Sequence, residues 1–154
     1  MFREMRRNDR QVSSEEARKL MEEAQYGVLS TTGENGYAYG VPLNHVLLDN
    51  SIYFHCAQVG EKIDNIAFSS KVSFCVIGNS EPIPEKFSYR YISAIAFGNC
   101  TEVTGAEKEA ALLALVEKYS GAFVPQGIEY IKKDMDKTKV MKIAIEHLTG
   151  KARR

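Results

Sequence analysis

The chain has 154 residues, a length that suits one domain with a real hydrophobic core. Its 20 Lys and Arg residues balance its 20 Asp and Glu residues, so no overall field attracts it to nucleic acid or to an anionic membrane. The sequence contains neither an apolar run long enough to span a membrane nor an apolar signal region at its start.

Residues 1–11 are charged, contain four arginines, and predict a basic arm outside the core. Such an arm could be solvated, cover a pocket or contact nucleic acid. Neutral net charge and the lack of a basic helix make the nucleic-acid contact the least favoured of the three. Ser13 and Glu16 then have the spacing of a capping box and predict a helix start. The apolar stripe of this helix consists of Ala17, Leu20, Met21 and Ala24.

The next segments have the pattern of antiparallel hairpins. Residues 26–31 and 37–43 read as strands joined by a turn at Asn35-Gly36, the strongest short hairpin signal in the chain. The extended pattern continues over 44–48, turns at Asp49-Asn50 and returns over 51–56, and such short connections keep this end of the sheet antiparallel. Pro42 cannot donate to a strand ladder, so it indicates an edge, a bulge or a place where something else meets the backbone.

The middle of the chain continues the sheet. Residues 71–77 predict a strand, and residues 78–86, with two prolines, predict a loop. Residues 87–103 predict one long strand, or two strands separated by a bend near Gly98.

The last third predicts two helices and a closing strand. The pattern from Thr104 to Glu107 matches a capping box that opens a helix to Tyr119, with Gly121 ending it. The remaining expectations are a short helix over 127–134 with Ile128 and Ile131 facing inward, a strand over 140–148 with Met141, Ile143, Ile145 and His147 on one face, and a basic tail over 150–154.

These elements predict a mainly β (α+β) fold in a single domain, 1–154. About six strands, mostly linked by hairpins and flanked by helices, favour a small antiparallel β-barrel over a doubly wound sheet. No G-x-G-x-x-G follows any predicted strand, which argues against a dinucleotide-binding Rossmann fold.

The stretch Ser51–Ile66 is the strongest candidate for a site. Alternation over 51–57 puts Ile52, Phe54 and Cys56 on one face and Tyr53, His55 and Ala57 on the other. Gly60 then breaks the strand and a helix begins, so unpaired N–H groups and Lys62 could hold a phosphate. The alternative is a plain strand-to-helix corner with a solvated lysine.

Histidine and cysteine residues suggest no metal site. Cys56, Cys75 and Cys100 lack C-x-x-C spacing, which argues against zinc or a disulfide framework and favours a reducing cytoplasm. His45 and His147 have no carboxylate or cysteine at ligand spacing, so we expect structural roles for both. His55 is either a hydrogen-bonded, inert residue or a catalytic proton donor, and its place on a mixed strand face by itself favours the inert role.

Six segments in order resemble the pyridoxamine 5′-phosphate oxidase-like family of split-barrel flavin-binding proteins. They are MRRNDR, YGVLST, GVPLNHV, IYFHCAQVGEKIDNI, YRYISAIAFGNCTEV and LTGKAR. Within this family the chain is most similar to the branch named for 5-nitroimidazole resistance, the Nim-type proteins. The resemblance runs from about Met5 to Arg153 and rests on the order and spacing of the segments.

The resemblance implies a six-stranded antiparallel split barrel and a homodimer that holds FMN, or FAD, between its subunits. The implied flavin contacts are Val41, Pro42, Leu43 and Asn44 along the isoalloxazine ring, and Phe54, His55, Cys56 and Ala57 on the neighbouring strand. Lys62 would bind the 5′-phosphate together with the backbone N–H groups of Gly60 and Glu61. Tyr89 and Arg90 would approach from the partner subunit.

The implied activity is that of a cytoplasmic oxidoreductase for small molecules, with nitroaromatic compounds as candidate substrates and a reduced nicotinamide as electron donor. A histidine occurs at the position of His55 in Nim-type proteins, which favours a catalytic role. The chain departs from the pyridoxamine oxidases themselves at Glu61, Tyr39 and Asn44, where those enzymes carry cations, so vitamin B6 oxidation is not expected. The alternative is a flavin- or haem-binding carrier or sensor without turnover.

Overall fold

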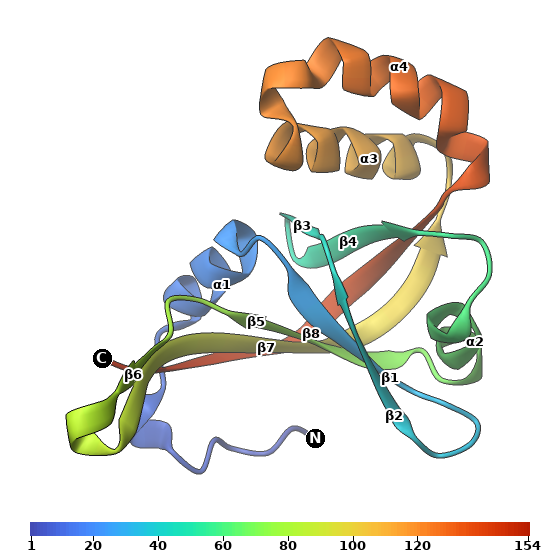
Figure 1. Cartoon of the computed structure of the whole chain (residues 1–154). Helices are drawn as coiled ribbons and strands as arrows, with labels where there is room; N and C mark the ends of the chain where they lie inside the picture. The colour runs from blue at the N-terminus through green and yellow to red at the C-terminus, as the bar shows by residue number, and fades with distance from the viewer.

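A computed structural model describes all residues, 1–154, and shows one strongly curved antiparallel sheet with helices at its ends (Figure 1). The strand order is β2-β1-β5-β7-β8-β4-β3, and β6 pairs with β7 off this path. The strands are β1 (Gly27–Thr32), β2 (Ala38–Leu43), β3 (Val46–Leu48), β4 (Ser51–Cys56), β5 (Lys71–Ile77), β6 (Glu81–Ile83), β7 (Ser88–Val103) and β8 (Lys139–Arg153). The helices are α1 (Ser14–Glu23), α2 (Glu61–Phe68), α3 (Gly105–Tyr119) and α4 (Val124–Asp134), with 3-10 turns at Asn8–Arg10, Pro84–Lys86, Gly121–Phe123 and Met135–Lys137.

The sheet curves into an incompletely closed barrel, which confirms the split-barrel prediction. Its two terminal strands, β2 and β3, are consecutive in the chain but do not pair with each other. Six strands have six or more residues; β3 and β6, with three residues each, were not separate strands in the sequence prediction.

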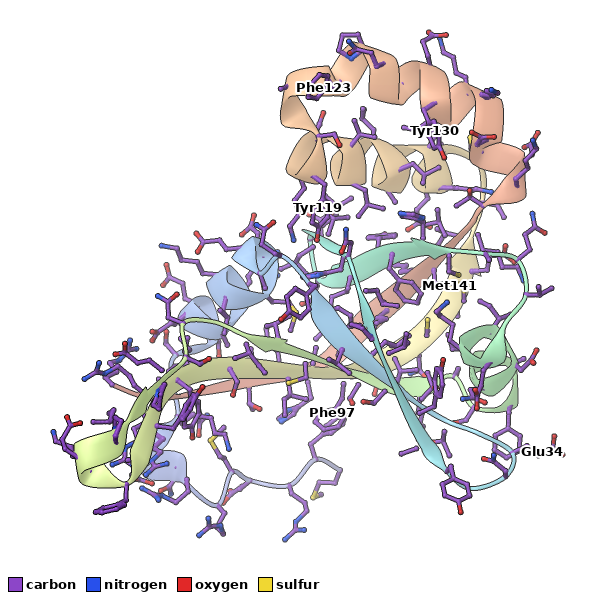
Figure 2. All side chains as sticks on the ribbon, viewed as in Figure 1. Glu34, Phe97, Tyr119, Phe123, Tyr130 and Met141 are labelled. Atoms are coloured by element: carbon purple, nitrogen blue, oxygen red, sulfur yellow. The ribbon has the colours of Figure 1, made fainter.

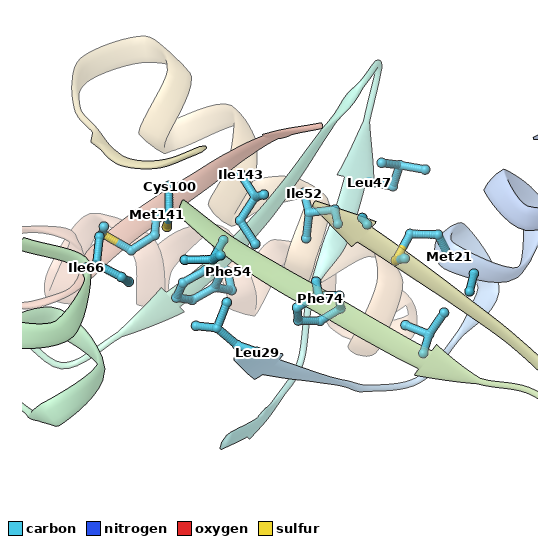
Figure 3. Close-up of a cluster of buried hydrophobic side chains, with 14 of the residues drawn as sticks. Met21, Leu29, Leu47, Ile52, Phe54, Ile66, Phe74, Cys100, Met141 and Ile143 are labelled. Atoms are coloured by element: carbon cyan, nitrogen blue, oxygen red, sulfur yellow. The ribbon is translucent and has the colours of Figure 1, made fainter. Parts of the chain in front are cut away.

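The main core lies inside the curve of the sheet (Figure 3). Its largest fully buried side chains include Phe54, Phe74 and Leu29 from strands, and Met21 from α1, which closes one end. The predicted cap of α1 is present, because the Ser13 hydroxyl accepts a hydrogen bond from the Glu16 N–H at 3.1 Å. The Glu16 carboxylate pairs with Arg154.

A bulge in β8 changes which residues face the core. Phe97 pairs with His147 and Gly98 pairs with Ile145, so Glu146 is an extra residue. Gly98 is required there, since a Cβ atom would lie 2.1 Å from the carbonyl oxygen of Ala144. The predicted common face of β8 is therefore wrong at His147, whose ring lies outside the barrel and stacks on Phe2 at 4.6 Å.

The ends of the chain differ from the prediction. The segment 150–154 is not a free basic tail, because β8 continues to Arg153 and pairs with Tyr91 of β7. The arm, 1–11, runs along the outer side of the sheet, and Gln11 forms a bridge with Lys151. No helix is both long enough and apolar enough to cross a lipid bilayer.

Helices α3 and α4 form a hairpin above β3 and β4 (Figure 1). A second core cluster, including Tyr53, Leu112, Leu115 and Ile131, joins the hairpin to the sheet. Two predictions fail here. Ile128 is 37% exposed, and only Ile131 is buried on α4, which begins at Val124 rather than at residue 127.

The predicted capping box at the start of α3 is also wrong. Thr104 makes no side-chain cap, and Gly105 begins the helix with a φ angle of 62°. The Glu107 carboxylate instead accepts hydrogen bonds from the Tyr53 hydroxyl at 2.6 Å and from Lys142 at 3.0 Å. These bonds fix the base of the hairpin to β4 and β8.

Candidate functional site

The corner between β4 and α2 forms where the sequence predicts it. Phe54 and Ile52 are fully buried in the main core, and Cys56 is buried there as well. Tyr53 and His55 point to the other face of the strand, toward the α3–α4 hairpin. A ligand at this corner can therefore touch Phe54 and Cys56 only through their backbone, whereas Ala57 is exposed.

The first turn of α2 presents unpaired donors. Gly60 has a φ angle of 147° and its carbonyl accepts bonds from the N–H groups of Ile63 and Asp64. The N–H groups of Glu61 and Lys62 have no backbone partner. Such N–H groups, at the positive end of the helix dipole, favour an anion.

Lys62 supplies the only cation of this turn. Its side chain is half-buried and makes no ion pair with any carboxylate. It lies near Cys56: burial raises the pKa of the thiol, and the Lys62 charge opposes that rise. Lys62 thus faces back toward β4.

The opposite side of the same turn is acidic. A shallow hollow there is lined by Glu34, Glu61 and Asp64, together with Asn35 and Gly60. An anion is repelled on this side and attracted on the Lys62 side. The residues therefore fit a phosphate in one orientation, between Lys62 and the end of β4.

Asn44 and His55 come together at the junction of β2, β3 and β4. Val46 pairs with Tyr53, and the same register carried back two residues places Asn44 opposite His55. Both line a cavity of about 230 Å³ between the sheet and the α3–α4 hairpin. Figure 2 shows Tyr119, another lining residue, on the side of α3 that faces the sheet.

His55 is free for a ligand. No residue of the chain forms a hydrogen bond with its ring, and solvent reaches it. The atoms around it nevertheless desolvate the ring, which lowers its pKa below 6.5. The imidazole is therefore neutral near pH 7 and can donate a hydrogen bond or pass on a proton.

The β2–β3 junction is held by a buried cluster that sequence reasoning missed. His45 has 0% exposure, and its Nε2 lies 2.7 Å from the carbonyl oxygen of Met21. The Tyr119 hydroxyl accepts a hydrogen bond from the His45 N–H at 3.1 Å, and Lys118 donates to the His45 carbonyl at 2.9 Å. The sequence expectation of a structural His45 agrees with this burial, but no local pattern linked it to residues 73 positions away.

The remaining predicted residues lie on β2 and at the far end of β7. Val41 and Leu43 pack against the main core, whereas Pro42 is exposed on β2, an edge strand that pairs only with β1. Tyr89 and Arg90 pair with β6, which lies at the end of the molecule opposite α2 (Figure 1), and Arg90 forms an ion pair with Glu81. Within one chain, Tyr89 and Arg90 are thus remote from Lys62.

Two larger hollows lie elsewhere, along the outer face of the sheet under the arm. They measure about 470 and 410 Å³, and Phe2 and Phe97 line both. No three His, Cys, Asp or Glu side chains gather in a geometry that could hold a metal ion.

The sequence matches the pyridoxamine 5′-phosphate oxidase family over residues 13–152, nearly the whole chain. The chain belongs to this family. The match spans every strand of the sheet and both candidate regions, the β4–α2 corner and the Asn44–His55 pair. No curated protein sequence matches the chain.

Several solved structures share this fold. A Bacteroides thetaiotaomicron protein assigned to 5-nitroimidazole antibiotic resistance is 21% identical, with a TM-score of 0.76 over 92% of this chain and 86% of that one. The FAD and haem binding protein of Mycobacterium smegmatis is 16% identical, with a TM-score of 0.81 over 94% and 74%. A FAD-binding protein of Mesorhizobium loti is 19% identical, with a TM-score of 0.65 over 94% and 98%. At these identities the likeness shows the shared fold.

Proposed function

We propose that this family member binds FMN and acts as an oxidoreductase on small molecules, with nitroaromatic compounds as candidate substrates and a reduced nicotinamide as electron donor. One observation supports this most. Lys62, at the start of α2, and the side chains of Asn44 and His55, which form no hydrogen bond within the chain, lie at the same end of β4. The three free cysteines suit a reducing cytoplasm.

In this proposal the residues at the end of β4 have separate roles in cofactor binding and in catalysis. Lys62 and the backbone N–H groups of Gly60 and Glu61 would hold the 5′-phosphate, because a phosphomonoester carries close to two negative charges near neutral pH. A bound flavin would supply the electron-transfer chemistry. His55 would meet the substrate as a hydrogen-bond donor or proton source.

The phosphate cradle also bears on which flavin binds. Its single lysine and its acidic neighbours Glu61 and Asp64 favour one phosphate, on the Lys62 side. A terminal monoester places its full charge there, which favours FMN. FAD is the second candidate, because two proteins of similar fold are named as FAD-binding.

In this proposal Tyr89 and Arg90 contact the flavin from a second subunit. The strand that they pair with, β6, lies at the opposite end of the sheet from α2 (Figure 1), so a homodimer with flavin at the interface would bring them to Lys62 of the other subunit. Arg90 would then exchange its exposed partner, Glu81, for an anionic part of the cofactor.

The visible spectrum of the purified protein tests the proposal. A flavin spectrum, followed by bleaching under anaerobic NADH or NADPH and reoxidation by a nitroaromatic acceptor, is the expected result. A Soret band would indicate a haem-binding module, for which the haem-binding protein of similar fold is a precedent. A flavin that binds but is never reduced would point to a carrier or sensor, and no chromophore after incubation with FMN would end the flavin proposal.

A further inference from the structure

The cavity beneath the α3–α4 hairpin is lined by two kinds of side chain. Its walls are apolar and come from both helices: Leu112, Leu115, Val116, Ile131 and Met135. Its polar side chains are Asn44 and His55 from the sheet side, Tyr119, Ser120 and Tyr130, and Asp134 and Thr138 from the end of α4 and the start of β8. Apolar walls with a few convergent polar groups are the usual make-up of a small-molecule site.

The polar groups of this cavity are not used by the protein itself. Tyr119 is engaged with the backbone at His45 and Gln25. The side chains of Asn44, His55 and Asp134, in contrast, form no hydrogen bond with any other residue. Asp134 has one ion pair, with Lys137 at 3.8 Å, and the Lys137 side chain is 78% exposed. The Asp134 side chain is only 24% exposed, so a carboxylate is held in the cavity with a weak, solvated partner.

The lining of the cavity carries an acidic group and no basic side chain of lysine or arginine. Asp134 is the single acidic residue of this lining. The phosphate of a pyridoxamine-type substrate would therefore meet a carboxylate and no cation. A positive or neutral ring, by contrast, finds Asp134 at one place and the Asn44–His55 pair at another.

We propose that this cavity is the substrate site and that it selects a small, single-ring aromatic molecule that is neutral or singly positive and carries no phosphate or carboxylate. The volume of about 230 Å³, below the range usual for drug-sized ligands, suits a molecule as small as one substituted ring. Asp134 attracts a cationic or N–H-bearing substituent, and Asn44 and His55 contact the group that accepts electrons. This proposal rests on the proposed function, because Asn44 and His55 also belong to the candidate flavin residues.

Three ligands of the same size separate charge from shape: 4-nitrobenzylamine, 4-nitrobenzyl alcohol and 4-nitrobenzoate. We expect calorimetric titration of the full-length protein, with and without FMN, to give the tightest binding for the amine and the weakest for the benzoate. In Asp134→Asn the advantage of the amine over the alcohol should shrink by about three- to tenfold, the range for one partly screened charge. Asp136→Asn removes an equal charge two residues away, outside the lining, and should leave the ranking unchanged.

Filling the cavity tests its location. Thr138→Phe and Ser120→Phe add a ring at two different lining positions, and either should weaken all three ligands by at least about tenfold without changing FMN affinity. Lys133→Phe adds the same ring at an exposed position of α4 that does not line the cavity.

The outcomes distinguish this inference from the flavin proposal. Equal affinities for the amine and the benzoate, no binding of any of the three, or filled variants that bind as well as wild type would overturn the substrate site. Failure of FMN to bind would overturn the proposed flavin function, while the ligand ranking in the flavin-free protein would still decide the charge selectivity of the cavity.

Discussion

The Nζ atom of Lys118 lies 2.9 Å from the carbonyl oxygen of His45, and so joins the end of α3 to the junction between β2 and β3. The same ammonium donates to the carbonyl of Ala24 at 2.8 Å. Next to this charge the Nδ1 atom of His45 is buried without a hydrogen-bond partner. A second positive charge on His45 would be both desolvated and repelled.

This arrangement predicts an acid-sensitive step in stability. Burial, and to a smaller extent the Lys118 charge, lowers the pKa of His45 from 6.5 to about 4. The unfolded chain therefore binds more protons between these two values, so the contribution of His45 is complete above pH 6.5 and is lost as the pH falls through about 4. The loss should amount to roughly 3 kcal/mol of unfolding free energy.

Urea unfolding from pH 7 to pH 4 measures this loss, with His45→Gln as the comparison. Gln can place an amide near the Nε2 position, and it does not titrate. The variant should show a shallower decline with acid, because the titration of His45 is removed from it. Parallel curves for wild type and variant would show that His45 does not control the acid limb.

Lys62→Ala should weaken the binding of FMN. The variant removes a charge-assisted contact worth roughly 1.5–3 kcal/mol, so the dissociation constant should rise about tenfold to a hundredfold. Riboflavin has no phosphate and should bind both proteins alike. Lys71→Ala, at an exposed position on β5, is the matched control for loss of one positive charge. Equal losses for FMN and riboflavin would place Lys62 away from the phosphate.

His55→Ala should separate catalysis from stability. Because the ring has no hydrogen-bond partner, we expect a change of less than about 0.5 kcal/mol in unfolding free energy. Single-turnover reduction of a nitroimidazole by the reduced flavoprotein should slow by about 10²–10⁴-fold if the ring is a general acid. His147→Ala, which removes the ring stacked on Phe2, should leave that rate unchanged. A less stable His55→Ala protein with normal turnover would refute the catalytic role.

The dimer prediction can be tested by mixing two inactive variants. Lys62→Ala and Arg90→Ala should each lose FMN affinity. If the site combines Lys62 of one subunit with Arg90 of the other, a mixed dimer carries one intact site and one doubly altered site. Random reassociation should therefore restore about a quarter of the wild-type sites, because half of the dimers are mixed. No recovery, or a monomer by light scattering with flavin still bound, would exclude a shared site.

Local patterns were sufficient to predict β4, α2 and the separation of Phe54 from His55. Alternation, a glycine break and helical spacing lie within Ser51–Ile66, so no distant residue was needed. The assignment of His55 to a cavity was not predictable, because its walls come from α3 and α4, more than 50 positions along the chain.

The errors share a physical cause, which is pairing between distant segments. His147 was placed on the core face because its alternation with Met141 is regular in sequence, but one bulged residue reverses the phase. Glu107 has the spacing of a capping residue, yet Tyr53 and Lys142 offer it stronger partners. Asp134, the acidic group of the cavity, had no signal in the sequence beyond its place near a helix end.

The α3–α4 hairpin leaves and re-enters the sheet at one rung of the ladder, since Val103 at the end of β7 pairs with Val140 near the start of β8. Residues 104–138 therefore form an insert whose two ends are already neighbours, and its length can change without shifting the pairing of either strand. The barrel and the lid over the cavity can thus diverge independently. A relative could keep the β4–α2 corner and acquire a different specificity by exchanging this insert alone, as a graft between Val103 and Val140 would reproduce.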